Sequence, residues 1–371
     1  MGDSLENNKM GEPLKNIYNE AFFHHLSLEL TKAYSAFNQK AFIETLFDKD
    51  WASKTLKQRM RHVTMCLHQC LPVDYRVSLD ILKTVSAQFK GFEYMFFPDF
   101  VEQYGLLDWE RSISALEHFT QFSSSEFAVR PFILQDEKRM MKQMVKWTSH
   151  SNPHVRRLAT EGCRPRLPWA IDLPNFKKNP EPVIGVIEKL KEDNSEYVRR
   201  SVANNLNDIS KDHPNLIIEL AKQWLGNNSL TDWIIKHGCR TLLKTGNIEA
   251  LILFGFQHST EITVNNLTLN PNSIQIGNEL SFSFDLKSTL SHLGKLRIEY
   301  GIYYVKANGS LSKKVFKISE GFYHETTKKI TRKHAFKDLT TRKHYPGEHK
   351  LTIIINGCEM AENYLRVVLA R

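Results

Sequence analysis

The sequence is poor in cysteine and lacks the features that direct a chain out of the cell or into a membrane. Its 371 residues include five cysteines, scattered and odd in number, which give no disulfide framework and favour a reducing cytoplasm. The start, MGDSLENNKMGEPLKN, has no apolar stretch typical of a secretory signal. No apolar run approaches the length that spans a bilayer. We therefore expect a cytoplasmic protein with no membrane partner.

Several motifs of cofactor-dependent enzymes are also missing. The sequence contains no GxGxxG, no Walker phosphate-binding loop and no GxSxG. Its best candidate metal ligands, His62, Cys66 and Cys70, share one helix face but lack the usual CxxC spacing, and His24-His25 is no better. These absences disfavour a nucleotide cofactor, and we expect neither an organic cofactor nor a metal.

The composition is that of an ordinary soluble protein, but its charge is uneven. Apolar residues make up 41% and charged residues 25%, and the length allows two domains. The net charge is +9. From Glu261 to Arg371 there are 17 Lys and Arg against 10 Asp and Glu, so the last third carries +7. This excess favours an acidic partner and makes the last third an electrostatic element of its own.

Two similar stretches near the middle indicate a helical repeat. SNPHVRRLATEGCRPRLPW (151–169) and NSEYVRRSVANNLNDISKDHP (194–214) align on their VRR triplets with an offset of 43 residues, which is within the period of HEAT and armadillo repeats. A shorter match, TDWIIK (231–236), follows at an offset of 36. Turn and N-cap residues open each stretch. Basic residues at equivalent repeat positions predict a concave, positively charged wall.

The pattern changes from helical to β near residue 260. Before that point apolar residues recur at helical spacing, and the segment 173–183 is predicted to be a long loop between repeats. The aromatic-rich GFEYMFFPDFVEQYG (91–105) is predicted to be core. After residue 260, alternating apolar and polar residues predict roughly seven short strands. The predicted fold is a flexible N-terminus (1–17), a HEAT-like helical domain (18–259) and a small immunoglobulin-like β-sandwich (260–371).

Three residues of the helical part are candidates for chemistry. Glu126 follows three serines, which are predicted to cap a helix with Glu126 in its first turn; a first-turn acid also has a purely structural explanation. Trp169 ends RPRLPW, where an aromatic beside two arginines could stack on a base or could simply pack. Asp208 lies eight residues beyond Arg200, roughly on one helix face, beside three asparagines that line either a site or an exposed helix end.

The segments that carry these residues resemble a known family. SSEFAVRPF, HVRRLATEGCRPRLPW and SEYVRRSVANNLNDISKDHP, with YPGEHKLTIIING near the end, resemble the AlkC-type DNA alkylation-repair glycosylases, relatives of the AlkD enzymes with HEAT-like repeats. The resemblance runs from about Tyr18 onward and implies an immunoglobulin-like domain after the helical one. It also implies a bacterial base excision repair hydrolase that removes 3-methyladenine, and also 3-methylcytosine, from duplex DNA. By this resemblance the catalytic residues are Glu126, Asp208 and Trp169, in a monomer without cofactor that works at the nucleoid.

The implied chemistry is consistent with these residue types. A base alkylated on nitrogen already carries a positive charge, so its glycosidic bond breaks without an acid to protonate the leaving group. A carboxylate would then stabilise the oxocarbenium-like sugar and orient water, and the indole would meet the cationic base. Selectivity would come largely from the charge and lability of the lesion, without insertion of a flipped base into a deep pocket.

Basic residues of both parts are candidates for phosphate contact. In the last third, two clusters flank residues 335–341 and are predicted to form a second clamp on bent DNA or, alternatively, a solvated loop face. The residues assigned to DNA are Arg156, Arg157, Arg164, Arg166, Arg199, Arg200, Lys236, Arg332, Lys333, Arg342 and Lys343.

Two other functions are compatible with these patterns. A non-catalytic HEAT-repeat scaffold that binds nucleic acid is the main alternative, because a fold alone does not establish an activity. A metal-dependent nuclease is disfavoured by the lack of an acidic metal-binding cluster. The sequence leaves open the relative rates on 3-methyladenine, 3-methylcytosine and 7-methylguanine, the groove contacted, and which carboxylate positions the water.

Overall fold

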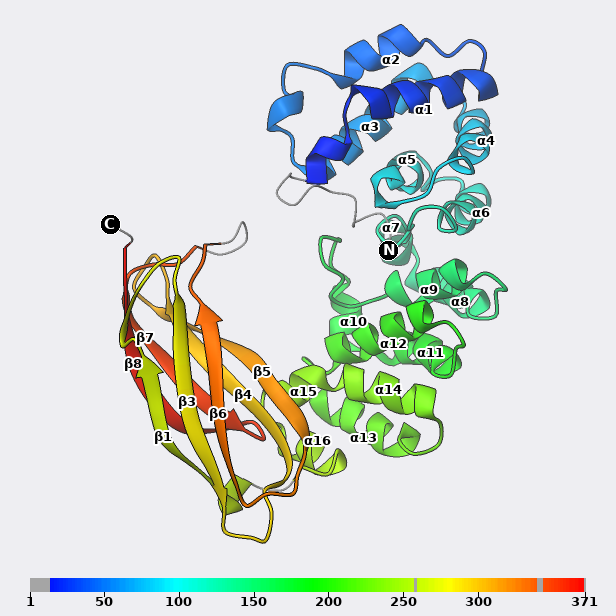
Figure 1. The fold of residues 1–371 in the computed structure, drawn as a ribbon. Coiled ribbons are helices and arrows are strands. Elements are labelled where there is room, and N and C mark those ends of the chain that lie inside the picture. Colours follow the sequence, from blue (N-terminus) through cyan, green and yellow to red (C-terminus); the bar gives the residue numbers. More distant parts are fainter. Residues whose placement is uncertain (1–13, 257–258, 339–342, 370–371) are drawn as a thin grey trace. The chain divides into compact units, whose positions relative to one another are not determined.

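A computed structural model describes residues 14–256, 259–338 and 343–369 (Figure 1). The α-helices extend no further than Leu253 and the strands begin at Ile262, which confirms the predicted order of a helical part followed by a β part. The chain forms two compact units. The first holds the residues up to Asp212 together with Leu225–Gly238, and the second holds His213–Trp224 and the residues from Cys239 onward. The predicted domain limits at 18–259 and 260–371 stay a prediction.

The N-terminal segment expected to be flexible is only partly described. Residues 1–13 lie outside the described residues, and Leu14–Ile17 forms the 3-10 helix η1. Lys15 holds it in place through two contacts, because its ammonium donates to the Ala52 carbonyl and its carbonyl accepts from the Arg59 guanidinium at 2.8 Å.

Short α-helices separated by turns build the helical part. They are α1 (Glu20–Ala33), α2 (Gln39–Leu46), α3 (Leu56–Cys70), α4 (Tyr75–Ser86), α5 (Phe96–Tyr104), α6 (Trp109–Phe119), α7 (Val129–Gln135), α8 (Glu137–Trp147), α9 (Pro153–Glu161), α10 (Pro174–Lys178), α11 (Glu181–Ile187), α12 (Glu196–Ile209), α13 (Pro214–Trp224), α14 (Ser229–Gly238), α15 (Arg240–Lys244) and α16 (Ile248–Leu253). Further 3-10 helices are η2 (Trp51–Ser53), η3 (Phe92–Tyr94), η4 (Glu188–Leu190) and η5 (Ser259–Glu261). None of the helices that the structure describes combines the length and apolar character that a membrane span requires.

The aromatic-rich stretch around η3 and α5 belongs to the core, as predicted. Phe96, Phe97 and Phe100 are fully buried. The Phe96 ring meets that of Phe22 on α1, and the Phe97 ring stacks on that of Phe119 on α6, so these rings join the N-terminal helices into one core. The predicted shared face of His62, Cys66 and Cys70 also exists on α3, with the Cys66 thiol 3.6 Å from the His62 ring.

The two aligned repeat segments form α9 and α12, which pack against each other, and the third segment forms α14, which packs on α12. Asn152 caps α9 with its side chain, and Pro153 occupies the first turn, where its missing N–H costs nothing. Val155 and Ala159 of α9 correspond to Val198 and Val202 of α12, and all four are buried. The repeat is therefore a packing repeat as well as a sequence repeat.

The segment 173–183, predicted to be a loop, is instead partly helical. It contains all of α10 and the start of α11. The loop prediction was wrong because the prolines of this segment do not prevent helix formation. Pro174 and Pro182 stand in first turns, where proline is tolerated, and Phe176 and Val183 bury apolar surface.

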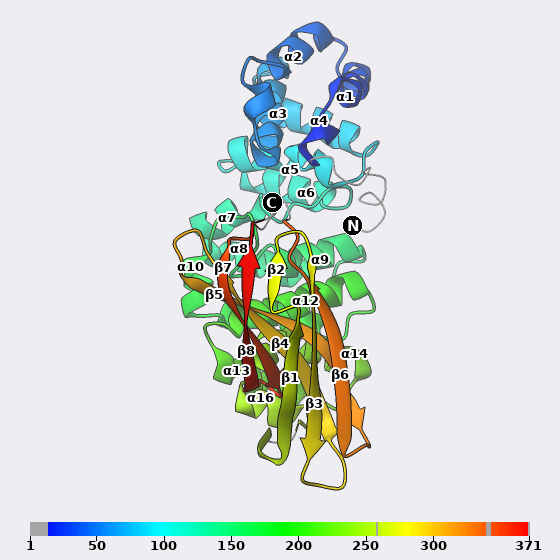
Figure 2. The ribbon, with the colours of Figure 1, turned by 60° about the vertical axis from the view of Figure 1, so that its left-hand side comes forward.

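Two β-sheets make up the β part, seen from two sides in Figures 1 and 2. One sheet has the order β1-β3-β6 and the other β2-β8-β7-β4-β5; neighbouring strands are antiparallel except for β2 and β8. The strands are β1 (Ile262–Asn270), β2 (Ser273–Gln275), β3 (Glu279–Ser288), β4 (Gly294–Val305), β5 (Leu311–Tyr323), β6 (Thr327–Ala335), β7 (Gly347–Ile355) and β8 (Cys358–Val368). Residues of both sheets, among them Phe282, Phe284, Ile298 and Ile353, share one hydrophobic core.

The described residues therefore contain eight strands where roughly seven were predicted. The strand that was not predicted is β6, an edge strand. Its sequence, TKKITRKHA, contains the first of the two basic clusters and pairs with β3. Its apolar alternation consists of Ile330 and little else, because His334 is the next buried residue on that face. Basic residues concealed the period-two pattern.

Within the second compact unit, two glycines hold the C-terminal helices against the β-sheet. Gly246, after α15, and Gly357, in the β7–β8 turn, both have positive φ, and a Cβ on Gly357 would overlap the Gly246 backbone. Beside them the Lys295 ammonium of β4 donates to the Phe254 carbonyl and lies 5.2 Å from the centre of the Phe256 ring. Helices α15 and α16 are thus joined to the sheet by backbone contact.

Candidate active site

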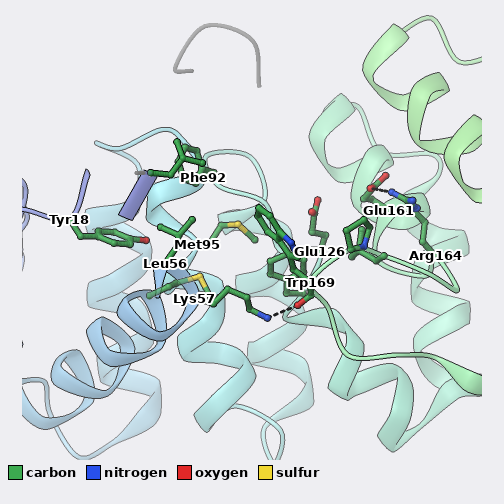
Figure 3. Close-up of a pocket in the computed structure, with 14 residues that line it drawn as sticks. Tyr18, Leu56, Lys57, Phe92, Met95, Glu126, Glu161, Arg164 and Trp169 are labelled. Carbon is green, nitrogen blue, oxygen red and sulfur yellow. Dashed lines mark hydrogen bonds and ion pairs between the residues drawn. The ribbon is translucent and has the colours of Figure 1, made fainter. Parts of the chain in front are cut away.

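A pocket of about 350 Å³ lies within the first compact unit (Figure 3). One end is apolar and the other carries charged groups. The lining residues are Leu14, Tyr18, Leu56, Lys57, Met60, Phe92, Met95, Glu126, Phe127, Glu161, Arg164, Leu167, Pro168 and Trp169. Two of the predicted catalytic residues, Glu126 and Trp169, are therefore brought together at one pocket.

Glu126 is positioned by a serine turn and not by a helix start. Helix α7 begins at Val129, so the prediction that Glu126 lies in a first helical turn was wrong. The reason is that the serine hydroxyls are engaged elsewhere: Ser124 donates to Glu126 at 2.7 Å, and Ser125 donates to the Leu116 carbonyl of α6 at 2.9 Å. Glu126 is 8% exposed, and its carboxylate also accepts from Arg157 at 2.7 Å.

Alternating charges connect the serine turn, α9 and α12 at the polar end of the pocket. Arg157 Nη2 lies 3.6 Å from Glu161, four residues further along α9. Glu161 Oε1 in turn accepts from Arg164 at 2.5 Å, and Arg164 Nε donates to Asp208 of α12 at 2.9 Å. The order along this charge chain is Glu126, Arg157, Glu161, Arg164, Asp208.

Asp208, the third predicted catalytic residue, lies at the far end of the charge chain and not in the pocket. It is 2% exposed and accepts from Arg164 and from Lys211, the latter at 3.3 Å. Three carboxylates thus face three cations, so the group is close to neutral, as a buried ionic network requires. That Asp208 is catalytic stays a prediction.

Glu161 is the functional candidate that the sequence did not single out. Its side chain lines the pocket beside the Arg164 guanidinium (Figure 3). It also lies near Arg157 and accepts from the Ser201 hydroxyl of α12 at 2.6 Å. Burial opposes its ionisation, but Arg157 and Arg164 outweigh burial and hold the pKa of Glu161 below its ordinary value. Glu161 is therefore an anion at neutral pH. The signal available in the sequence was its position between two arginines, four residues after Arg157 on α9 and three residues before Arg164.

The neighbouring carboxylates stabilise the charged forms of Arg157 and Arg164. Burial opposes the charge of Arg157, yet Glu161 and Glu126 raise its pKa; Glu161 and Asp208 do the same for Arg164. The Arg157 guanidinium also stacks 4.5 Å from the centre of the Tyr197 ring on α12. Both side chains are cations engaged with carboxylates, and their predicted contact with phosphate stays a prediction.

Trp169 stands at the pocket with an unusual backbone. Its φ is +65°, in the left-handed region that residues other than glycine seldom adopt, and the residue is 71% exposed. An exposed indole held in this way is available to a ligand and adds little to the core.

The other basic residues predicted to bind DNA lie outside the pocket. Arg156 forms two bonds with Asp193, at 2.6 and 3.0 Å, and so ties α9 to the start of the next repeat. Arg166 pairs with Asp212, Arg199 donates to the carbonyls of Asp193 and Asn194, Arg200 pairs with Glu196, and Lys236 is exposed on α14. The predicted equivalence of repeat positions is therefore incomplete, since Arg157 is buried and its counterpart Arg200 is exposed.

In the β part, Arg332 and Lys333 are exposed on the edge strand β6, and Lys343 is exposed as well. Arg342 lies outside the described residues. Among the residues that the structure describes, no group of three or more His, Cys, Asp or Glu side chains is arranged to hold a metal ion.

Taken as a class, this is a helical-repeat protein with paired carboxylates and an exposed tryptophan at one pocket, extended by a β-sandwich. Residues 108–249 match the family described as DNA alkylation repair enzyme, and residues 263–369 match the C-terminal immunoglobulin-like domain of the uncharacterised protein YhaZ. The chain is 52% identical over 345 residues to the uncharacterized protein YhaZ of Bacillus subtilis (strain 168), covering 93% of this chain and 96% of YhaZ.

A solved structure is similar over almost the whole chain. It is the alkylpurine DNA glycosylase AlkC of Pseudomonas fluorescens, bound to DNA containing an abasic site analog. The identity is 38%, the TM-score is 0.92, and the match covers 96% of this chain and 100% of the other. This chain belongs to the AlkC-type DNA alkylation-repair glycosylases, with a C-terminal immunoglobulin-like domain.

Proposed function

We propose that this chain hydrolyses the N-glycosidic bond of cationic N-alkylated bases, 3-methyladenine and 3-methylcytosine, in duplex DNA. The observation that supports this most directly is the pair of carboxylates, Glu126 and Glu161, lining one pocket beside the exposed Trp169. Such a site offers negative charge and an aromatic face, which are the two features that a cationic base and a developing sugar cation need.

The charge chain supplies the electrostatic part of the mechanism. When the bond to an alkylated base breaks, the base leaves as a neutral molecule and the positive charge moves to the sugar. Carboxylates fixed beforehand by Arg157 and Arg164 stabilise that charge without reorganising. One carboxylate then orients the water that attacks the anomeric carbon, as in glycoside hydrolysis.

Selectivity in this proposal follows from the charge of the lesion. Apart from its charged end, the pocket is lined mainly by Leu, Met, Phe, Pro and Trp side chains, which carry few groups able to read the edge of a base. An unmodified base would need protonation before it could leave, and the buried guanidiniums keep their protons because their pKa values are raised. Excision therefore requires neither a deep base-recognition pocket nor a cofactor.

The β part would hold the duplex. Arg332 and Lys333 on β6, together with Lys343, present positive charge that suits phosphates and carries no sequence information. The site is built from one chain, so we propose a monomer acting on chromosomal DNA at the nucleoid of the bacterial cytoplasm.

Release of free base tests the proposal. Duplex DNA treated with a methylating agent is incubated with the full chain in the presence of EDTA, and the released bases are separated and quantified. Release of 3-methyladenine is the expected result. DNA binding without release would leave a non-catalytic repeat scaffold, and strand cleavage that requires added metal would indicate a nuclease.

A further inference from the structure

The segment that carries Trp169 is fixed by cations from two other helices. We call residues 162–171, which follow α9, the site loop. Arg130 of α7 is fully buried and donates to three of its carbonyls: Gly162 at 3.0 Å, Arg164 at 2.9 Å and Ile171 at 2.6 Å. Burial lowers the pKa of Arg130 to about 10, which leaves it cationic at neutral pH.

A second cation binds the site loop at the tryptophan itself. Lys57 of α3 donates to the Trp169 carbonyl at 2.5 Å, a contact drawn in Figure 3, and its ammonium lies 5.1 Å from the centre of the Phe127 ring. Lys57 precedes Trp169 by 112 residues, so this contact joins the N-terminal helices to the site loop.

Trp169 needs such external support. A left-handed backbone at a bulky residue is unfavourable, and it persists only where the surroundings hold it. The indole is mostly exposed, so packing of the ring does not provide that hold. The carbonyl contacts of Lys57 and Arg130 do, because Lys57 binds the Trp169 carbonyl and Arg130 binds the loop before it, at Arg164, and after it, at Ile171.

We propose that Lys57 and Arg130 are positioning residues, which hold the site loop so that the Trp169 indole stands at the pocket and Arg164 faces Glu161. The expected effect on the rate of base release rests on the proposed function. The expected effect on the environment of Trp169 rests on the geometry of the site loop alone. Lys57 is the residue to test, because it is exposed and its replacement leaves the core intact.

The structural readout is the environment of Trp169. The protein is labelled with 5-fluorotryptophan, and the Trp169 signal among the six tryptophans is assigned with W169F. In K57M the Trp169 fluorine signal should shift or broaden, and in K57R, which still donates to a carbonyl, it should return. The control is K40M, which removes an exposed lysine of α2 whose nearest carboxylate, Glu44, is 3.9 Å away. An unchanged Trp169 signal in K57M would overturn the proposal.

The kinetic readout separates positioning from a direct contact with DNA. Under single-turnover conditions K57M should release 3-methyladenine about tenfold more slowly, with DNA affinity and its salt dependence unchanged, and K57R should recover most of the rate. In a W169A background K57M should add little, because both substitutions remove the same function. Weaker binding with a flatter salt dependence would instead mean that Lys57 contacts phosphate, and the proposal would fail.

Arg130 gives an independent check. R130K keeps the positive charge but cannot reach three carbonyls at once, and it should disturb the same Trp169 signal as K57M. If the wild-type protein releases no base, the proposed function fails, while the fluorine signals of K57M and K57R still decide whether the cations hold the loop.

Discussion

At the scale of single residues, the site is defined by which carboxylates reach the pocket. Glu126 and Glu161 line it, whereas Asp208 is separated from it by Arg164. In the proposed mechanism, charge next to the sugar matters more than charge further along the chain, because electrostatic stabilisation weakens with distance.

The carboxylates can be ranked by amide substitution. We expect E126Q and E161Q each to slow single-turnover release of 3-methyladenine by about 10²–10³-fold, the size of effect that follows loss of one preorganised oxyanion-hole donor. DNA affinity should change little. D208N should act through Arg164 and produce a smaller loss if Asp208 only supports the arginine. The control is E110Q, which neutralises an exposed glutamate of α6.

A loss for D208N as large as that for E161Q would assign Asp208 a direct catalytic role. A loss of binding in step with the loss of rate would mean that the carboxylates are structural. Measuring the dissociation constant and the single-turnover rate on the same duplex distinguishes a catalytic role from a structural one.

The depressed pKa of Glu161 also predicts how stability depends on pH. A carboxyl group whose folded pKa lies below its unfolded value of about 4.5 stabilises the fold above that pH, and this contribution is lost as the pH falls through the folded pKa. The difference in unfolding free energy between wild type and E161Q should therefore be largest above about pH 4.5 and shrink below it. Urea unfolding from pH 7 to pH 3 measures this difference, which would be constant with pH if Glu161 were unperturbed.

At the scale of elements, the sequence predicted most of the helices and strands for which the apolar period was undisturbed. The repeat of VRR identified α9 and α12, and the alternation of SFSFDL identified β3. It failed at α10 and α11, where prolines occupy first turns, and at β6, where Lys328 and Arg332 occupy positions of the apolar half of the alternation. These failures share one cause: the same residue type is compatible with an element at one position and incompatible with it at another.

The site shows the same limit. Three residues were assigned by resemblance, yet Glu161 and Lys57 were not, although both line the pocket. Lys57 is one lysine of a helix and does not stand out locally, and the local sign at Glu161 is limited to its position between Arg157 and Arg164. Their importance arises from contacts over 40 and 112 residues of sequence, Glu161 with Ser201 and Lys57 with Trp169, and periodicity does not reveal such contacts.

The edge strand β6 carries the prediction for DNA binding by the β part. Replacing Arg332, Lys333 and Lys343 with Ser should weaken binding to undamaged duplex and reduce the slope of log K against log salt by about 0.9 for each phosphate that the protein no longer neutralises. The control replaces Lys287, Lys306 and Lys314 with Ser, which removes the same charge from other exposed positions of the β part. Equal slopes for the two triple variants would exclude a clamp at β6.

At the scale of the whole molecule, Gly246 and Gly357 join the C-terminal helices to the β-sheet within the second compact unit. G357A should lower the free energy of unfolding by more than the ~1–2 kcal/mol that a left-handed backbone costs an L-residue, because its Cβ would also overlap Gly246. The control is G309A in the β4–β5 turn, where φ is also positive, at +78°, but no atom lies within 4 Å of the added Cβ.

Chemical unfolding of both variants checks this prediction. G309A should show the backbone cost alone, so the difference between the two variants measures the overlap. Equal destabilisation would mean that the β7–β8 turn moves away from α15 without cost.

The contact between Gly246 and Gly357 also limits where the chain could be cut to transfer the β part to another protein. A chimera that cut the chain near residue 260 would leave the β7–β8 turn facing a foreign helix, whose side chains would occupy the space that Gly246 leaves open. A transplantable module would have to begin no later than Cys239, so that α15 and α16 travel with the sandwich. In this fold, the unit available for exchange is larger than the β-rich segment alone.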